Sequence, residues 1–253
     1  MKLFLPPNLF VEILKSFLNN SNVFDINVMG SSLLSSQLEN DRNAVALIPS
    51  LDIINHRDIF VSGKVGIAFD GTLSNSYFYL SQNENRTLGN IFIRGDVSIN
   101  EIILTKILFE ERFSAEVEIT LDTYSEPNTS QNTLVVGNEN FTKWDYNSGI
   151  SFSDQMAELL DLPYVNFVFA SYNKQNLEQL ESFFSDIDKK VEEKISDILT
   201  KIPANDEVKE YIQNNLGTVY FEMTSNETDA LEEMIKLVYY HGILDDMFDI
   251  KFI

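Results

Sequence analysis

The feature that most constrains the fold is an alternation of short apolar runs with helix-like segments over the first fifty residues. Residues 2–5, 24–29 and 45–48 form the apolar runs, which are typical of buried strands. Residues 9–18 and 33–39 have helical character, and Ser31 or Ser32 is well placed to cap the second helix. This alternation is typical of βαβ units that build a parallel sheet, so the chain predicts an α/β fold.

The rest of the chain predicts two lobes with mixed sheets flanked by helices. Further strands are expected at residues 65–68, 75–80, 90–93, 117–121, 133–136 and 162–172, and further helices at 99–113, 177–202 and 228–241. A hydrophilic stretch after residue 80 indicates a crossing into a second lobe, and the run 162–172 suits a returning strand. We therefore expect lobe I to hold residues 1–80 and 173–253 and lobe II residues 81–172. Two crossings make a hinge with a ligand cleft between the lobes.

Composition restricts the partners that this protein can have. Eighteen basic residues against 39 acidic residues give a formal charge of −21, which disfavours nucleic acid and anionic membrane surfaces. A small anionic ligand remains possible, because local hydrogen-bond donors act within the screening distance of about 8 Å. Cysteine is absent, the N-terminal apolar run is too short for a signal peptide, and no long apolar run occurs. We expect a cytoplasmic protein, and the sequence leaves its oligomeric state open.

Small polar residues follow several of the expected strands. Ligands of open α/β sheets bind beyond the carboxyl ends of strands, and a turn before a helix offers free N–H groups to a carboxylate. The substrate-binding candidates at these ends are Ser50, Gly71, Thr72, Ser98, Asn100, Gly137 and Asn138. Asp70 adds a carboxylate at the end of the strand expected at 65–68, and we expect it to lie beside Ser50.

Few residues suit acid–base or metal chemistry. The two histidines, His56 and His241, are interpreted as a surface-loop residue and a helix-terminal residue. The acidic runs 178–181 and 186–193 are interpreted as the solvated face of one long helix over residues 177–202. No metal site and no cofactor are expected.

Four short segments resemble the chorismate dehydratase family of menaquinone biosynthesis. They are residues 43–50 (NAVALIPS), 65–71 (VGIAFDG), 134–138 (LVVGN) and 162–165 (LPYV). The resemblance extends from about Leu33 to Leu244 and implies a type II solute-binding-protein-like fold without an export signal. It further implies a lyase of the futalosine pathway that eliminates water from chorismate to give 3-[(1-carboxyvinyl)oxy]benzoate.

The resemblance assigns roles that this sequence matches in part. Ser50, Asp70 and Gly71 match the family pattern directly, whereas the N-terminal asparagine motif is replaced by Phe4-Leu5-Pro6-Pro7-Asn8. Asp70 is a candidate base and Asn8 a candidate substitute for the displaced asparagine. A non-catalytic paralogue that binds a small carboxylate is the first alternative. An enzyme similar to 1,4-dihydroxy-6-naphthoate synthase, which relies on a cleft histidine, is the second.

Overall fold

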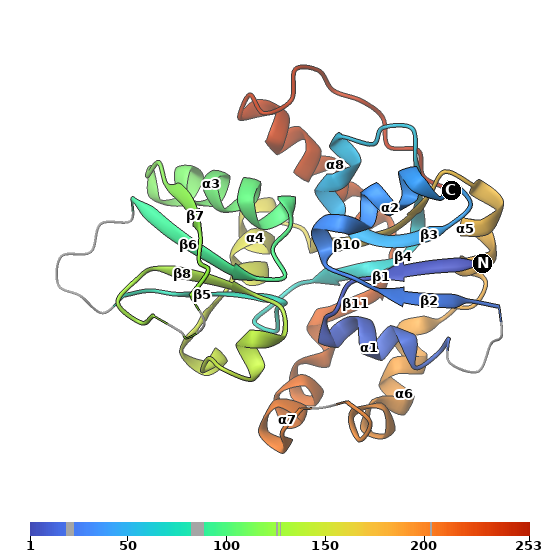
Figure 1. Ribbon diagram of the computed structural model, residues 1–253, viewed down its shortest axis with the longest axis horizontal. Coiled ribbons are helices and arrows are strands. Elements are labelled where there is room, and N and C mark those ends of the chain that lie inside the picture. The colour runs from blue at the N-terminus through green and yellow to red at the C-terminus, as the bar shows by residue number, and fades with distance from the viewer. Residues whose placement is uncertain (19–22, 82–88, 125, 127, 203) are drawn as a thin grey trace.

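Two mixed β-sheets form the framework of the protein. The computed structural model describes residues 1–253 apart from 19–22, 82–88, 125, 127 and 203. Sheet A has the strand order β11-β4-β10-β3-β1-β2, and sheet B has the order β7-β6-β8-β5-β9. Both contain parallel and antiparallel pairs. The predicted two-lobed α/β fold is confirmed (Figure 1).

Each sheet belongs to one lobe. Sheet A consists of β1 (Lys2–Leu5), β2 (Asp25–Val28), β3 (Val45–Pro49), β4 (Phe60–Phe69), β10 (Tyr164–Ser171) and β11 (Val219–Glu222). Sheet B consists of β5 (Ser76–Tyr79), β6 (Asn90–Gly95), β7 (Glu118–Leu121), β8 (Thr133–Val136) and β9 (Ile150–Ser151). We call the sheet A half lobe I and the sheet B half lobe II.

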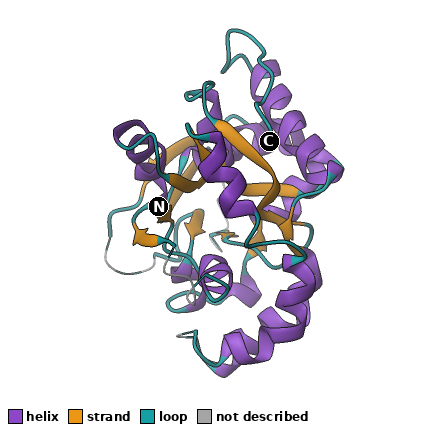
Figure 2. Cartoon of the chain, turned by 90° about the vertical axis from the view of Figure 1, so that its right-hand side faces the viewer, coloured by secondary structure: helices purple, strands orange, loops and turns teal. Residues whose placement is uncertain are grey.

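Helices cover both sheets. Lobe I carries α1 (Leu9–Lys15), α2 (Leu34–Asn40), α5 (Lys174–Glu181), α6 (Ile187–Leu199), α7 (Asp206–Asn215) and α8 (Ser225–Tyr240), and lobe II carries α3 (Ile99–Phe113) and α4 (Phe152–Leu160). Short 3₁₀ turns are η1 (Ser31–Leu33), η2 (Ser50–Ile54), η3 (Asn138–Phe141), η4 (Tyr146–Ser148) and η5 (Leu216–Thr218). Figure 2 views the molecule from the lobe I side, where helices surround the strands. None of the described helices has the length and apolar character needed to cross a membrane.

The lobe boundaries differ from the prediction. The strand β5 was expected in lobe I but pairs with β8 and β9 in sheet B, and β10 was expected in lobe II but pairs with β3 and β4 in sheet A. The two crossings are therefore residues 70–75 and 161–163. Both strands are wholly buried, and a buried apolar strand has the same sequence pattern in either sheet.

The long helix expected at residues 177–202 is two helices, α5 and α6. The break lies at residues 182–186, where Asp186 has a left-handed backbone with φ of 51°. Phe184 in this break is buried and stacks on Phe169 of β10, with ring centroids 5.7 Å apart. Packing of the break against sheet A thus overrides a helical periodicity that continues through it.

Candidate functional site

The two lobes meet through polar side chains that follow the strands of both sheets. From lobe I come Asn8 after β1, Ser31 after β2 and Ser50 after β3; from lobe II come Asp96, Ser98 and Asn100 after β6 and Asn138 after β8. We call these seven residues the junction. Of the predicted ligand-binding residues, Ser50, Ser98, Asn100 and Asn138 therefore lie in one region, together with the candidate Asn8, and Gly137 precedes Asn138.

Asn100 joins lobe II to lobe I inside the protein. It is 0 % exposed, and its Oδ1 accepts a hydrogen bond from Leu51 N–H at 2.9 Å. Its Nδ2 donates to Asn166 C=O at 2.7 Å and to Ser50 Oγ at 3.2 Å. Ser50 Oγ in turn donates to Val165 C=O at 2.7 Å. Both predicted ligand residues thus use their side chains to hold the lobes together.

Ser98, a predicted ligand-binding residue, is the N-cap of α3. Ser98 Oγ accepts from Asn100 N–H, while Ser98 N–H and Oγ both donate to Glu101 Oε2, at 2.9 and 2.6 Å. This reciprocal arrangement is a capping box. Burial raises the pKa of Glu101, whose Oε1 has no hydrogen-bond partner within the described part of the chain. The donors of Ser98 are therefore committed to Glu101.

Asp96 of lobe II is bound by Ser31 of lobe I. Ser31 N–H donates to Asp96 Oδ1 at 2.8 Å, and Ser31 Oγ donates to Asp96 Oδ2 at 2.6 Å. Ser31 was predicted to cap the second helix, but the N-cap of α2 is Leu33, and Ser31 is the first residue of η1 and donates to Asp96 instead. Gly30 and Gly137 lie next to Asp96, since a Cβ at either position would be 3.5 or 3.6 Å from an Asp96 atom.

Asn8 and Asn138 lie on the lobe I and lobe II sides of the junction. Asn8 is 1 % exposed and caps α1, with its Oδ1 accepting from Val11 N–H at 2.9 Å. Its buried Nδ2 has no partner among the residues that the structure describes. Asn138 is exposed and donates from Nδ2 to Pro7 C=O at 3.2 Å. The unsatisfied Nδ2 of Asn8 therefore belongs to the residue directly after Pro7, which Asn138 contacts.

Asp70 does not lie beside Ser50, so that expectation is wrong. The strands β3 and β4 that precede these residues are separated by β10 in sheet A. Gly71 packs against Thr218, since a Cβ at Gly71 would be 2.8 Å from Thr218 Cγ2. Thr72 is exposed, and its C=O accepts hydrogen bonds from the hydroxyls of Tyr77 and Tyr211 at 3.0 and 3.1 Å. Asp70, Gly71 and Thr72 thus belong to the crossing and not to the junction.

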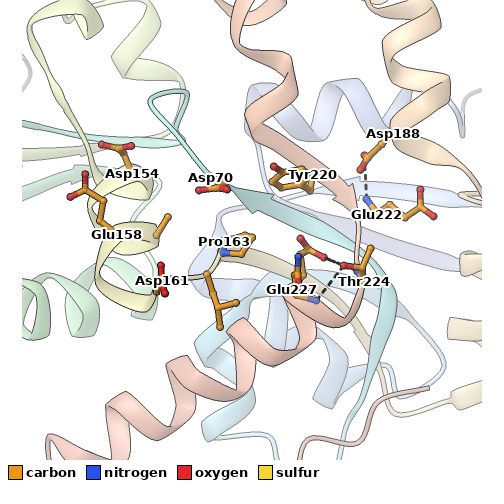
Figure 3. A pocket seen from close by; sticks show the side chains of 13 residues that line it. Asp70, Asp154, Glu158, Asp161, Pro163, Asp188, Tyr220, Glu222, Thr224 and Glu227 are labelled. Atoms are coloured by element: carbon orange, nitrogen blue, oxygen red, sulfur yellow. Dashed lines mark hydrogen bonds between the residues drawn. The ribbon is translucent and has the colours of Figure 1, made fainter.

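Asp70 lines a cavity of about 770 Å³ between the lobes (Figure 3). Seven carboxylates line it: Asp70, Asp154, Glu158, Asp161, Asp188, Glu222 and Glu227. The described lining contains no lysine, arginine or histidine, and no group of described residues has an arrangement that could hold a metal ion. Burial raises the pKa of Asp188 to about 6, although its Oδ1 accepts from the N–H groups of Phe221 and Glu222. This cavity repels an anionic substrate, which argues against Asp70 as the base for chorismate.

Neither histidine lies at the junction. His56 Nδ1 is 3.3 Å from Glu39 Oε1 within lobe I. His241 follows α8 and contacts Glu110 and Glu111 of α3. An enzyme that depends on a cleft histidine therefore has no support from this arrangement.

Comparison with known proteins identifies the fold. No family model matches the sequence, and no curated protein sequence matches it. Among solved structures, protein AF1704 from Archaeoglobus fulgidus aligns with a TM-score of 0.62 and 13 % identity over 96 % of this chain and 98 % of that chain. The Candida albicans CA3427 gene product, described as having the generic periplasmic binding protein fold, gives 0.58 and 12 % over 98 % and 92 %. The periplasmic aliphatic sulphonate binding protein SsuA from Escherichia coli gives 0.56 and 11 % over 99 % and 95 %. The chain therefore has the two-lobed type II periplasmic-binding-protein fold.

Proposed function

We propose that this protein is a non-catalytic binding protein that closes its lobes over a small ligand bearing a carboxylate or a similar oxyanion. The observation that carries the proposal is the recognition of the Asp96 carboxylate by Ser31, which places one donor on each carboxylate oxygen. Charge-assisted hydrogen bonds of this kind are strong and depend on geometry. The same two donors suit the oxyanion of a ligand.

The surroundings of Ser31 support a ligand of this class. Gly30 and Gly137 adjoin the bound carboxylate and present no side chain to it, since a Cβ at either would lie 3.5 or 3.6 Å from an Asp96 atom. Each hydrogen bond to a charged group contributes about 1.5–3 kcal/mol, so local donors such as Ser31 can bind an oxyanion despite the net negative charge of the chain. Two proteins of the same fold have names that point to related chemistry, since SsuA from Escherichia coli is named for aliphatic sulphonates and SsuA from Xanthomonas axonopodis pv. citri is bound to MOPS.

Asp96 competes with the ligand for Ser31 in this proposal. A tethered carboxylate acts at an effective concentration on the order of millimolar, so it weakens the binding of a free carboxylate. We expect Asp96→Ala to raise the affinity for carboxylate or sulfonate ligands by about tenfold. Isothermal titration calorimetry with chorismate, benzoate, succinate and taurine measures this change.

The matched control is Asp229→Ala, which removes the same charge from an exposed position on α8. It should leave every affinity within about twofold of the wild type, because exposed charges are screened by salt. Weaker binding in Asp96→Ala than in the wild type, or the absence of binding to either protein, would refute an oxyanion site at Ser31.

A chorismate dehydratase-like lyase is the second candidate. The observation in its favour is the buried, unpartnered Nδ2 of Asn8, two residues after the position where the resemblance implies an asparagine. Mass spectrometry of the purified protein incubated with chorismate tests it. Formation of 3-[(1-carboxyvinyl)oxy]benzoate, and its loss in Asn8→Ala, would replace the binding-protein proposal with a lyase. An unchanged chorismate pool would remove the lyase.

A further inference from the structure

A histidine bridges the two lobes away from the junction. His241 directly follows α8 of lobe I, and its side chain is 11 % exposed. Its Nδ1 lies 3.2 Å from Glu110 Oε2 and its Nε2 lies 2.8 Å from Glu111 Oε1. Both glutamates are in the C-terminal part of α3 of lobe II. Figure 1 shows the end of α8 reaching toward α3.

The number of N–H groups on the imidazole decides how well it can make both contacts. A neutral imidazole has one N–H donor, so the lone pair of its second nitrogen faces the second carboxylate. A protonated imidazole donates from both nitrogens and satisfies both glutamates. Its position at the C-terminus of α8 also favours a positive charge, because the helix dipole is negative there. Geometry and charge therefore both favour the protonated form when the lobes are in contact.

The other charged groups nearby have partners elsewhere. Arg112, the next residue of α3, pairs with Glu158, and Lys236 of α8 pairs with Glu233. The segment after His241 carries Asp245 and Asp246, and Asp246 pairs with Arg57. Among the described residues, neither Glu110 nor Glu111 forms an ion pair with a lysine or arginine. His241 is therefore the cation available to these two carboxylates.

We propose that His241, Glu110 and Glu111 form a proton-dependent latch that favours closure of the lobes in acid and releases it as the pH rises. The sign follows from linkage, because closure brings the two carboxylates to the imidazole and thereby favours the form that carries the proton. Closure should be strongest below the range in which histidine titrates and weakest above it. The latch does not depend on which ligand the junction binds.

Lobe closure can be measured by single-molecule energy transfer. The chain has no cysteine, so Thr123→Cys in lobe II and Lys189→Cys in lobe I provide two specific labelling sites at exposed positions. We expect the closed-to-open ratio of the ligand-free protein to fall about threefold between pH 6 and pH 8. His241→Gln and the pair Glu110→Gln with Glu111→Gln should each remove this difference.

His56→Gln is the matched control, because His56 contacts Glu39 within lobe I and should leave the threefold change intact. Asp52 and Asp188, whose pKa burial raises to about 6, titrate in the same range but remain in every variant. Circular dichroism confirms that each variant is folded. A pH dependence of the same size in His241→Gln, or a closed-to-open ratio of the wild type that does not change with pH, would overturn the latch. These closed-to-open ratios are measured on the ligand-free protein, so a failure of ligand binding at Ser31 would not affect them.

Discussion

Replacement of Asn100 with alanine is expected to lower the free energy of unfolding by about 3 kcal/mol and to open the lobes. Asn100 is fully buried between α3 and lobe I, and its removal leaves Leu51 N–H and Asn166 C=O without their partner. Each buried polar group left unsatisfied costs about 1–3 kcal/mol. Equilibrium denaturation in urea measures the loss, and small-angle X-ray scattering measures an increase in the radius of gyration.

Asn176→Ala provides the comparison for Asn100→Ala. Asn176 Nδ2 donates at 2.6 Å to Asn43 C=O, and both residues belong to lobe I. We expect a loss of about 0.5–1 kcal/mol and no change in the radius of gyration, because the hydrogen bond is exposed and lies within one lobe. Equal losses in the two variants, with equal radii of gyration, would show that Asn100 does not hold the lobes together.

Local signals in the sequence predicted several elements to the residue. The helix α3 has the predicted bounds Ile99–Phe113, and β8 has the predicted bounds Thr133–Val136. Ser98 and Glu101 lie three residues apart and form a capping box, so the start of α3 is decided by adjacent residues. Elements with boundaries set by neighbouring residues are therefore the ones that the sequence predicts best.

Contacts between distant residues explain what the sequence did not predict. Ser31 and Asp96 are 65 residues apart, so nothing near Ser31 indicates that its acceptor comes from the other lobe. The insertion of β10 between β3 and β4 separates Ser50 from Asp70, although the chain order β3, β4 suggests neighbours. The order of strands in a sheet depends on the packing of the whole chain, which short patterns do not report.

At the candidate site, the roles of the side chains depend on partners that lie far away in the sequence. Ser50 and Asn100 lie where the lobes meet, but the Asn100 side chain binds backbone groups of lobe I and Ser50 Oγ, and Ser50 Oγ donates to Val165 C=O of its own lobe. A small polar residue after a strand has the same sequence pattern whether it binds a ligand or a backbone group. Asp96, in contrast, is half-buried and accepts hydrogen bonds from Ser31 N–H and Oγ, two donors that a ligand could also use. The distinction requires the hydrogen-bond partners of each side chain.

Arg94 of β6 is the second residue whose replacement should have a large effect. Its side chain is 4 % exposed and pairs with Asp122 at 2.9 Å and with Glu139 at 2.8 Å, and the Asp122 side chain is 1 % exposed. Burial alone would lower the pKa of Arg94, but the hydrogen bonds and charges of Glu139 and Asp122 raise it. Arg94→Met should lower the free energy of unfolding by about 3–5 kcal/mol, because it leaves a buried carboxylate without a counter-charge. Thermal and urea denaturation measure this loss.

A second substitution separates the lost ion pair from lost packing. Asp122→Asn keeps the acceptor that Tyr124 N–H uses at 2.9 Å but removes the charge, so the double variant should be more stable than Arg94→Met alone. Arg112→Met, which removes a partly exposed pair with Glu158, should cost about 1 kcal/mol or less. If Asp122→Asn gives no recovery, the unpaired carboxylate is not the cause of the loss. Recovery would show that Arg94 neutralises the buried carboxylate of Asp122; its other partner, Glu139, adjoins Asn138 of the junction. The buried cation of Arg94 would then contribute to the stability of lobe II through its pair with Asp122.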